Sequence, residues 1–308
     1  MTCGILLLDK PPGLSSSGAT QRVRRLLGVD KAGHVGSLDP LATGMLPICL
    51  GDATKVAGEV LEGAKTYRFR IVLGARTATG DIEGDVVESS PVPAVDPERR
   101  AEVFRGFLGQ SSQIPPMYSA IKQGGQPLYR LARAGLTVER PARTIRIDRL
   151  DIEKWGSDWL DCRVVCGKGT YVRVLAEDIA VALGTCGHVG WLRRESVDPF
   201  PPGSMVDLAE VEACARSGRI PALFPADAAV SHLPAVRVQG DAERRLALGQ
   251  ELDGGAEVAF ATPVPAPGST VRLHSGDGRF LGLGLMTGDS VVRAKRLFKP
   301  MTQDASTE

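Results

Sequence analysis

Short strands with alternating apolar residues are interleaved with amphipathic helices over residues 4–198, and few folds accommodate this pattern. From Tyr67 to Leu73 apolar side chains alternate with Arg68 and Arg70, as in a strand with one buried face. Successive strands are often separated by hairpin-like distances, which favours antiparallel neighbours over a doubly wound parallel fold. We therefore predict an α+β domain built on a mixed, largely antiparallel sheet.

Caps and breakers delimit the other elements of this region. The serines at 15–17 offer N-caps for a helix that Gly28 ends, and Thr170 is the expected cap of a later helix. Residues 31–51 are expected to form an ordered loop with short strand pieces, and residues 110–127 a polar loop. Further strands are predicted at residues 4–8, 145–152, 160–166 and 188–194, and further helices at 97–108, 128–134, 171–183 and 207–217.

From about Leu233 the pattern changes to short β-type runs separated by Gly, Pro and Asp. The runs AVRV, EVAF, TVRLH, FLGLGLM and SVVRAKRLF have the length and spacing of strands in a small closed sheet. We therefore predict two domains, residues 1–230 and a β-barrel-like domain over residues 231–308.

Composition argues against a wholly disordered chain, a strongly basic protein and a membrane-spanning protein. With 43% hydrophobic residues the chain can bury a core, and a net charge of +1 gives no global basic field, so a nucleic-acid partner must be recognised from local patches. None of the six cysteines forms a C-x-x-C pair, so we expect reduced thiols and no metal. No segment approaches the roughly 20 apolar residues of a membrane span. We expect a cytoplasmic protein without membrane contact.

The segment GHVGSLDPLATG, residues 33–44, carries a single carboxylate, Asp39, between Leu38 and Pro40. Glycines on both sides allow a close backbone approach to a ligand, and Pro40 stiffens the segment. Spacing alone favours a simpler interpretation, in which Asp39 caps a turn. If Asp39 is catalytic, it lacks the second carboxylate of an ordinary glycosidase, so it is expected to act as a nucleophile or an ion-pair stabiliser.

A carboxylate nucleophile has to stay ionised, which requires a fixed cation nearby. The segment CGKGTYVRVLAED, residues 166–178, offers Arg173 at the start of a predicted helix, although a surface arginine is the commoner case. The KGT in this segment is not a phosphate loop, because Lys168 is followed by Gly169 rather than Ser or Thr and no glycine precedes it at the required spacing.

Several motifs in sequence order make the chain similar to one family. GILLLDKPPGLSS, GHVGSLDPLATGMLPICLGDATK, KTYRF, PPMYSAIKQGGQPLYRLARAG and CGKGTYVRVLAEDI resemble the TruB family, the bacterial synthases that make pseudouridine at uridine 55 in the T arm of tRNA. The resemblance implies a pseudouridine-synthase catalytic domain over residues 1–230 and an RNA-binding domain of the PUA type over residues 231–308. It also implies base flipping and an intramolecular transfer that needs no cofactor, so the expected partner is tRNA and the expected state a monomer without protein partners.

The resemblance also implies roles for individual residues. Asp39 matches the catalytic aspartate, Tyr67 the active-site tyrosine and Arg173 the cation that pairs with the aspartate. Without the family, Tyr67 would be interpreted as a core residue of an alternating strand. Whether the aspartate attacks C1′ of the ribose, attacks the pyrimidine ring or assists a glycal route stays open. Residues implied in substrate binding are His34, Tyr171, Leu192 and Lys10.

A basic stretch between Lys122 and Arg149 contains seven Lys and Arg residues but only Glu139 and Asp148 as acids. In the family this region, about residues 110–150, resembles an insertion that closes on the RNA arm, where basic side chains contact phosphates. A solvated helix face would be an equal alternative without the motifs. The residues implied in contacts with the RNA backbone are Lys122, Arg130, Arg133, Arg143 and Arg146.

One departure from the family pattern lies at Ala78, where relatives often carry an acid before the position of Asp81. Two other functions compete with the one implied. One is an RNA-binding or RNA-chaperoning protein with a vestigial aspartate, and the other is a synthase that acts on ribosomal or guide-directed RNA. The presence of Asp39, Tyr67 and Arg173 together argues against the first, and the full insertion sequence argues against the second.

Overall fold

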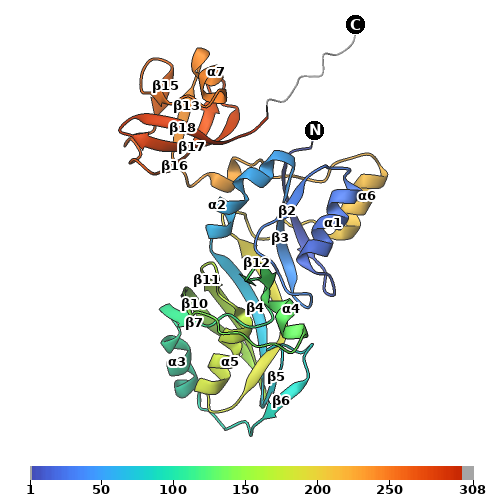
Figure 1. Ribbon diagram of the computed structural model, residues 1–308. Helices are drawn as coiled ribbons and strands as arrows, with labels where there is room; N and C mark the ends of the chain where they lie inside the picture. The colour runs from blue at the N-terminus through green and yellow to red at the C-terminus, as the bar shows by residue number, and fades with distance from the viewer. Residues whose placement is uncertain (1, 300–308) are drawn as a thin grey trace.

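A mixed sheet of eight strands forms the centre of the computed structural model, which describes residues 2–299 (Figure 1). All neighbouring strands are antiparallel except β3 and β12, which are parallel. The predicted fold class, mixed and largely antiparallel, is therefore confirmed. In spatial order the strands are β1 (Gly4–Lys10), β3 (Thr43–Leu50), β12 (Gly187–Val197), β4 (Lys65–Leu73), β11 (Trp159–Cys166), β10 (Arg143–Trp155) and β7 (Gly109–Gln113), with β2 (Ala32–His34) paired to β3.

Helices cover the sheet where their apolar faces match it. In α5, Leu175 and Ile179 are fully buried and share a hydrophobic cluster with Phe69 and Ile71 of β4. Helices α1 and α6 lie side by side near the first strands, and α3 and α5 lie together at the other end (Figure 1). The helices and 3-10 turns are α1 (Ser16–Leu26), η1 (Gly51–Val56), α2 (Ala57–Glu62), α3 (Pro97–Gly106), α4 (Leu128–Arg133), α5 (Val172–Ala182), α6 (Leu208–Arg216) and η2 (Ala228–Val230).

Two predicted loops contain sheet strands. Within residues 31–51, β3 is a full and almost entirely buried strand despite Pro47, whose carbonyl accepts a hydrogen bond from the Val35 N–H at 2.9 Å. Within residues 110–127, β7 pairs with β10 at the edge of the sheet. The strand pieces expected within residues 31–51 are therefore present, although β3 is longer than predicted, whereas the loop predicted over residues 110–127 begins with a strand. Long-range pairing overrides the weak local strand signal of segments rich in Gly, Pro and polar residues.

The cap expected at Thr170 is also wrong. Its hydroxyl donates to the Gly167 carbonyl at 3.2 Å, and Tyr171 is the N-cap residue of α5 without a capping side-chain bond. Ser15, in contrast, caps α1 as predicted, because its hydroxyl accepts from the Gly18 N–H at 3.0 Å.

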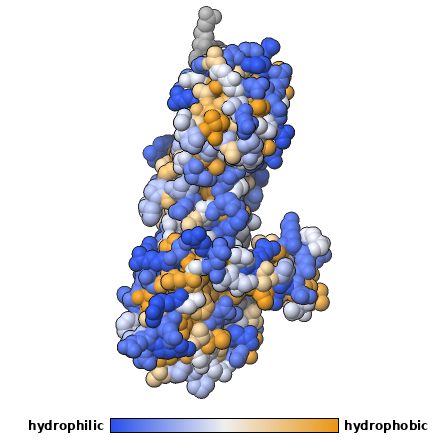
Figure 2. Space-filling view, turned by 90° about the vertical axis from the view of Figure 1, so that its left-hand side faces the viewer, coloured by the Kyte–Doolittle hydropathy of each residue, from blue (hydrophilic) through white to orange (hydrophobic). Residues whose placement is uncertain are grey.

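The basic insertion is shorter than its sequence suggested. Residues 110–113 and 143–150 belong to β7 and β10, so the part that leaves the sheet, called the insertion from here on, is 114–142. It contains α4 and two short paired strands. The space-filling side view in Figure 2 shows a lobe that projects from the body at about the height of α4 in Figure 1. The short strands outside the large sheet are β5 (Ala75–Thr77), β6 (Val86–Ser89), β8 (Lys122–Gln123) and β9 (Gln126–Pro127).

The C-terminal part forms a six-stranded, nearly closed barrel-like sheet, as predicted. The helix α7 (Asp241–Ala247) in this part was not expected, and residues 300–308 of the predicted domain lie outside the described residues. In spatial order the strands are β14 (Leu252–Asp253), β18 (Val291–Leu297), β17 (Phe280–Gly288), β16 (Thr270–Ser275), β13 (Ala235–Val238) and β15 (Val258–Phe260). We propose that the domain boundary lies between η2 and β13, the first strand of this part in sequence order.

The two parts of the molecule are joined by a shared hydrophobic cluster. Leu283 of β17, flanked by Phe280 and Phe298, packs in the same cluster as Val56 and Val60 of η1 and α2. Polar contacts frame this cluster: the Lys55 ammonium donates to the Leu297 carbonyl at 2.7 Å, and Arg272 pairs with Asp227 at 3.2 Å. The C-terminal sheet is therefore packed onto the N-terminal part and not merely tethered to it.

Candidate active site

Asp39 lies in the connection between β2 and β3, and buried anchors hold its segment. The hydroxyl of Ser16, at the start of α1, accepts from the Leu38 N–H at 2.7 Å and donates to the Leu38 carbonyl at 2.9 Å. The Pro40 carbonyl accepts from the Gly13 N–H at 2.9 Å. These bonds fix the backbone on both sides of Asp39, while its side chain remains 36% exposed.

Arg173, the second residue of α5, holds this carboxylate in a two-point contact. Its Nε lies 2.9 Å from Asp39 Oδ2, and its Nη2 lies 3.2 Å from Oδ1. The guanidinium is only 4% exposed, and its other donors bond the carbonyls of Thr79 at 2.6 Å and Tyr118 at 2.7 Å. The predicted pair of Asp39 with Arg173 is thus present in the structure, and its geometry is set by segments far apart in sequence.

A second carboxylate stands behind this pair. Asp81 is buried, and its Oδ2 lies 3.8 Å from Arg173 Nε, near the limit of an ion pair. The Thr79 hydroxyl donates to Asp81 Oδ1 at 2.6 Å, and the Glu83 N–H donates to the same oxygen at 3.1 Å. Although Ala78 departs from the family pattern, Thr79 and Asp81 form a closed turn against Arg173.

Tyr67 and Leu192 come from adjacent strands and line the same cavity. Tyr67 on β4 lies opposite Arg194 on β12, and Leu192 lies opposite Phe69. Both side chains are buried, Tyr67 at 9% and Leu192 at 6% exposure. An aromatic ring and an apolar side chain therefore stand at the wall of the cavity that contains Asp39.

Tyr171 is placed by a side chain that sequence reasoning missed. Gln113, on the edge strand β7, is buried, accepts from the Tyr171 N–H at 2.8 Å and donates to the Tyr171 carbonyl at 3.2 Å. This pair of hydrogen bonds to the Tyr171 backbone holds the N-terminus of α5 in place, and with it Arg173. The polar sequence around Gln113 carried no signal of this contact.

These residues enclose a cavity of about 940 Å³, a volume typical of small-ligand sites. Residues of the insertion, among them Tyr129 and Arg133, form part of its lining. Predicted site residues that line this cavity are Asp39, Tyr67, Arg133, Tyr171, Arg173 and Leu192.

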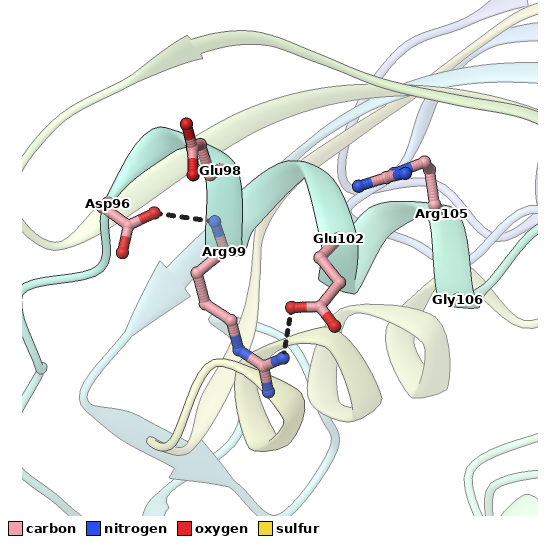
Figure 3. A pocket seen from close by; sticks show the side chains of 6 residues that line it. All are labelled: Asp96, Glu98, Arg99, Glu102, Arg105 and Gly106. Atoms are coloured by element: carbon pink, nitrogen blue, oxygen red, sulfur yellow. Dashed lines mark hydrogen bonds and ion pairs between the residues drawn. The ribbon is translucent and has the colours of Figure 1, made fainter.

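A second hollow, on the surface of α3, has a different character (Figure 3). Its polar groups largely satisfy each other: the Asp96 carboxylate caps the Arg99 N–H at 2.7 Å, and the Arg99 guanidinium pairs with Glu102 at 2.7 Å. It is an open, charged helix surface, so we do not treat it as a candidate site.

Lys10 and His34 do not line the cavity. Lys10 is fully buried, and its ammonium donates to the carbonyls of Pro11 and Leu14 at 2.8 Å and of Pro40 at 3.2 Å. It therefore supports the Asp39 segment from the side away from the cavity, and its expected role in substrate binding stays a prediction. His34 bonds Thr20 and Ser37, of which Ser37 lines the cavity, so its substrate role stays a prediction.

The predicted phosphate-binding side chains are exposed around the insertion. Lys122, Arg130 and Arg133 lie within it, and Arg143 and Arg146 lie at its base on β10. Arg146 is paired with Asp148 at 2.6 Å, which neutralises part of its charge.

Burial and charge set the protonation of the site in opposite directions. Burial raises the pKa of Asp39 above its ordinary value, and the guanidinium of Arg173 opposes this rise. Burial likewise raises the pKa of Tyr67, against the charge of Arg194. Burial also lowers the pKa of Lys65, at the cavity wall, to about 8. The wall beside Tyr67 thus carries Lys65 and Arg194, two cations that sequence reasoning did not single out.

Within residues 2–299, His, Cys, Asp and Glu side chains form no group of three or more that could hold a metal ion. In the same range, every helix is too short or too polar to span a bilayer.

Almost the whole chain matches known protein families and known proteins. Residues 24–172 match the N-terminal domain of the TruB pseudouridylate synthase family, and residues 173–231 and 234–298 match two C-terminal domain families of TruB. Proteins named tRNA pseudouridine synthase B from Burkholderia pseudomallei strain 668 and from Chromohalobacter salexigens are 45% and 44% identical over 294 residues. The alignments cover 96% of this chain in both cases, and 96% and 94% of the relatives.

A solved structure described as a Cbf5-Nop10-Gar1 complex contains a chain with a similar fold. It is 25% identical, with a TM-score of 0.72, and the match covers 96% of this chain and 85% of that one. The matched domains and the near full-length relatives lead to one conclusion: this chain belongs to the TruB family of pseudouridine synthases.

Proposed function

We propose that the protein converts uridine 55 in the T arm of tRNA to pseudouridine. The observation that carries this proposal is the Asp39 carboxylate, held at two points by Arg173 in a cavity that Tyr67 and Leu192 also line. The near full-length relatives are named tRNA pseudouridine synthase B, which supports tRNA as the substrate class. Our proposal assigns the chain the same activity.

The reaction is an isomerisation and balances without a co-reactant. The bond from ribose C1′ to uracil N1 breaks, the base turns, and C1′ forms a bond to C5. The hydrogen on C5 leaves as a proton, and N1 gains a proton. The uridine has to leave the base stack first, because neither C1′ nor C5 can be reached within a folded stem-loop.

The side chains of the cavity divide this work. The Tyr67 ring offers a stacking face, worth roughly 1–3 kcal/mol per base, and Leu192 supplies an apolar contact that excludes water. Arg173 favours the ionised form of Asp39 and directs the carboxylate into the cavity. The same placement serves attack on C1′, attack on the pyrimidine ring and the glycal route.

The experiment that tests the proposal maps the modified nucleotide. The purified protein is incubated with a T-arm stem-loop, with full tRNA and with ribosomal RNA fragments, and pseudouridine is located by chemical labelling and primer extension. We expect one modified position, uridine 55, in the two tRNA substrates. Binding without any pseudouridine would favour the RNA-chaperone alternative, and modification of ribosomal RNA alone would favour the other synthase class.

The pH dependence of turnover should reflect Asp39. Because burial raises its pKa and the reaction needs the carboxylate, activity is present above that pKa and lost as the pH falls through it. We expect the acid limb of the single-turnover rate to lie above the ordinary aspartate value of 3.8. Single-turnover assays between about pH 4 and 8 measure it, with a thermal melt at each pH to confirm that the fold persists. A rate that stays flat down to the acid end of this pH range contradicts the assignment.

Arg143 should contribute to RNA affinity through a phosphate contact. It is exposed at the base of the insertion, and we expect Arg143→Gln to weaken T-arm binding and to lower the salt slope by about 0.7–0.9. Arg146→Gln should have a smaller effect because Asp148 already pairs with Arg146. Filter binding across a salt series measures both changes.

Arg99→Gln on the surface of α3 is the matched control for charge, because Arg99 lies in the hollow of Figure 3, whose lining residues are all distinct from those of the active-site cavity. An Arg143→Gln slope equal to that of Arg99→Gln would remove Arg143 from the RNA interface.

We further propose that the C-terminal sheet binds RNA and that the enzyme acts as a monomer in the cytoplasm. The match of residues 234–298 to a TruB C-terminal domain family supports the first part, and the location of the proposed substrate supports the last.

A further inference from the structure

Arg194 on β12 is the largest fully buried side chain among residues 2–299, at 1% exposure. No acidic side chain in that range lies within the 4.0 Å ion-pair distance of its guanidinium. Burial of a charge is unfavourable unless the group is paired or fully hydrogen-bonded, and an apolar side chain would pack at lower cost. The groups that accept hydrogen bonds from this guanidinium therefore indicate its role in the fold.

Two of its donors bind the ends of the Asp39 segment. Nη2 donates to the Gly36 carbonyl at 2.8 Å, and Nε donates to the Met45 carbonyl at 2.7 Å. The backbone of Arg194 closes the same contact, because a Cβ on Gly44 would lie 2.1 Å from the Arg194 carbonyl oxygen. Residues 36–45, which contain Asp39, are thus clamped to β12 by one residue.

The third nitrogen of the Arg194 guanidinium, Nη1, faces Tyr67. Nη1 lies 3.5 Å from the Tyr67 hydroxyl, and the guanidinium carbon lies 6.0 Å from the centre of the Tyr67 ring. Because an arginine can only donate, the Tyr67 oxygen accepts, and its hydrogen points away from the guanidinium. Arg194 and Tyr67 both line the cavity and lie opposite each other in the β12 and β4 register.

We propose that Arg194 is a positioning residue of the synthase site, which clamps the Asp39 segment and orients the Tyr67 hydroxyl so that carboxylate and ring meet the same base. This inference rests on the proposed function. Lys65 is a second buried cation at this wall: its ammonium lies two residues from Tyr67 on β4 and donates to the Leu61 and Gly63 carbonyls at 2.5 Å. The charge of Arg194 favours the ionised form of Tyr67 against burial, which raises its pKa.

The test compares Arg194→Met, which removes the charge, with Arg194→Lys, which keeps the charge but loses the fork of donors. Arg193→Gln is the matched control, because Arg193 is the next residue, is 38% exposed and pairs with Asp9 at 2.7 Å. Each variant is assayed for single-turnover pseudouridine formation, for affinity to the T-arm stem-loop and for the Tyr67 titration. The titration uses NMR of tyrosine labelled at Cζ, with Tyr67→Phe to assign the resonance among the four tyrosines.

We expect Arg194→Met to slow turnover by about 100-fold with RNA affinity nearly unchanged, as for a site displaced by about 1 Å, and to raise the pKa of Tyr67. Arg194→Lys should retain the wild-type Tyr67 titration but still turn over roughly tenfold more slowly. A wild-type rate or an unchanged Tyr67 titration in folded Arg194→Met overturns the inference. If that variant does not fold, a wild-type rate in Arg194→Lys overturns it.

The failure of the two proposals can be told apart. A wild-type protein that makes no pseudouridine refutes the proposed function, whereas the Tyr67 titration still measures the contact with Arg194. A wild-type protein that is active, with an equally active Arg194→Met, refutes the positioning role alone.

Discussion

Replacement of Asp39 by asparagine is expected to reduce pseudouridine formation in a T-arm stem-loop by about 10⁴-fold or more, with RNA affinity nearly unchanged. Asparagine keeps the shape of the side chain and can still bond Arg173, but it removes the negative charge that all three chemical routes use. The anchors at Leu38 and Pro40 involve backbone atoms, so the segment should keep its conformation. Release of tritium from RNA labelled at C5 of uridine measures the rate, and filter binding measures the affinity.

The control for this variant is Asp30→Asn, which makes the same chemical change at an exposed position before β2. It should turn over at the wild-type rate. An Asp39→Asn rate above about one hundredth of wild type, after the preparation has been checked for deamidation, would remove Asp39 from the chemistry.

Arg173→Ala is expected to slow the chemical step by roughly 100- to 1000-fold and to change RNA affinity little. The guanidinium is almost fully buried against Asp39, Thr79 and Tyr118, so it faces the carboxylate and backbone carbonyls. Its loss also removes the charge that opposes the raised pKa of Asp39, so the acid limb of the rate profile should move to higher pH. Single-turnover assays over a pH series record both effects.

Arg173→Lys separates charge from geometry at this position. A lysine keeps the positive charge but cannot contact both carboxylate oxygens as the arginine does, so we expect an intermediate rate and a smaller shift of the acid limb. Circular dichroism melts show whether each variant is folded at the assay temperature. If folded Arg173→Ala turns over at the wild-type rate, Arg173 only supports the fold.

The chemistry of the site was partly predictable from the residues alone. A single carboxylate in a stiff glycine-flanked segment implied a nucleophile or an ion-pair stabiliser, and an ionised nucleophile implied a nearby cation. Arg173, 134 residues later in the chain, was a candidate for this cation because of its place at the start of a predicted helix, and the resemblance to the TruB family assigned it the role. The structure then supplied the two-point geometry and the carbonyls that hold the guanidinium in place.

The supporting residues could not be predicted, because their signals are not local. Gln113 lies in a polar stretch that becomes a strand only by pairing with β10. Arg194 lies beneath the Asp39 segment only because β3 and β12 pair in parallel, a contact between segments about 150 residues apart. Alternation along β4 and caps such as Ser15, which depend on neighbouring residues, were predicted correctly.

The hydrophobic cluster that Leu283, Phe280 and Phe298 share with η1 and α2 has a consequence for substrate choice. Because this shared cluster, and not a linker, joins the two parts, we expect a fixed distance between the cavity and the RNA-binding surface that we propose on the C-terminal sheet. An RNA that contacts both the cavity and the C-terminal sheet would then be selected by the distance between its two contact points as well as by its sequence. Lengthening or shortening such an RNA by one base pair would move its uridine out of register with the cavity, however well its loop matches.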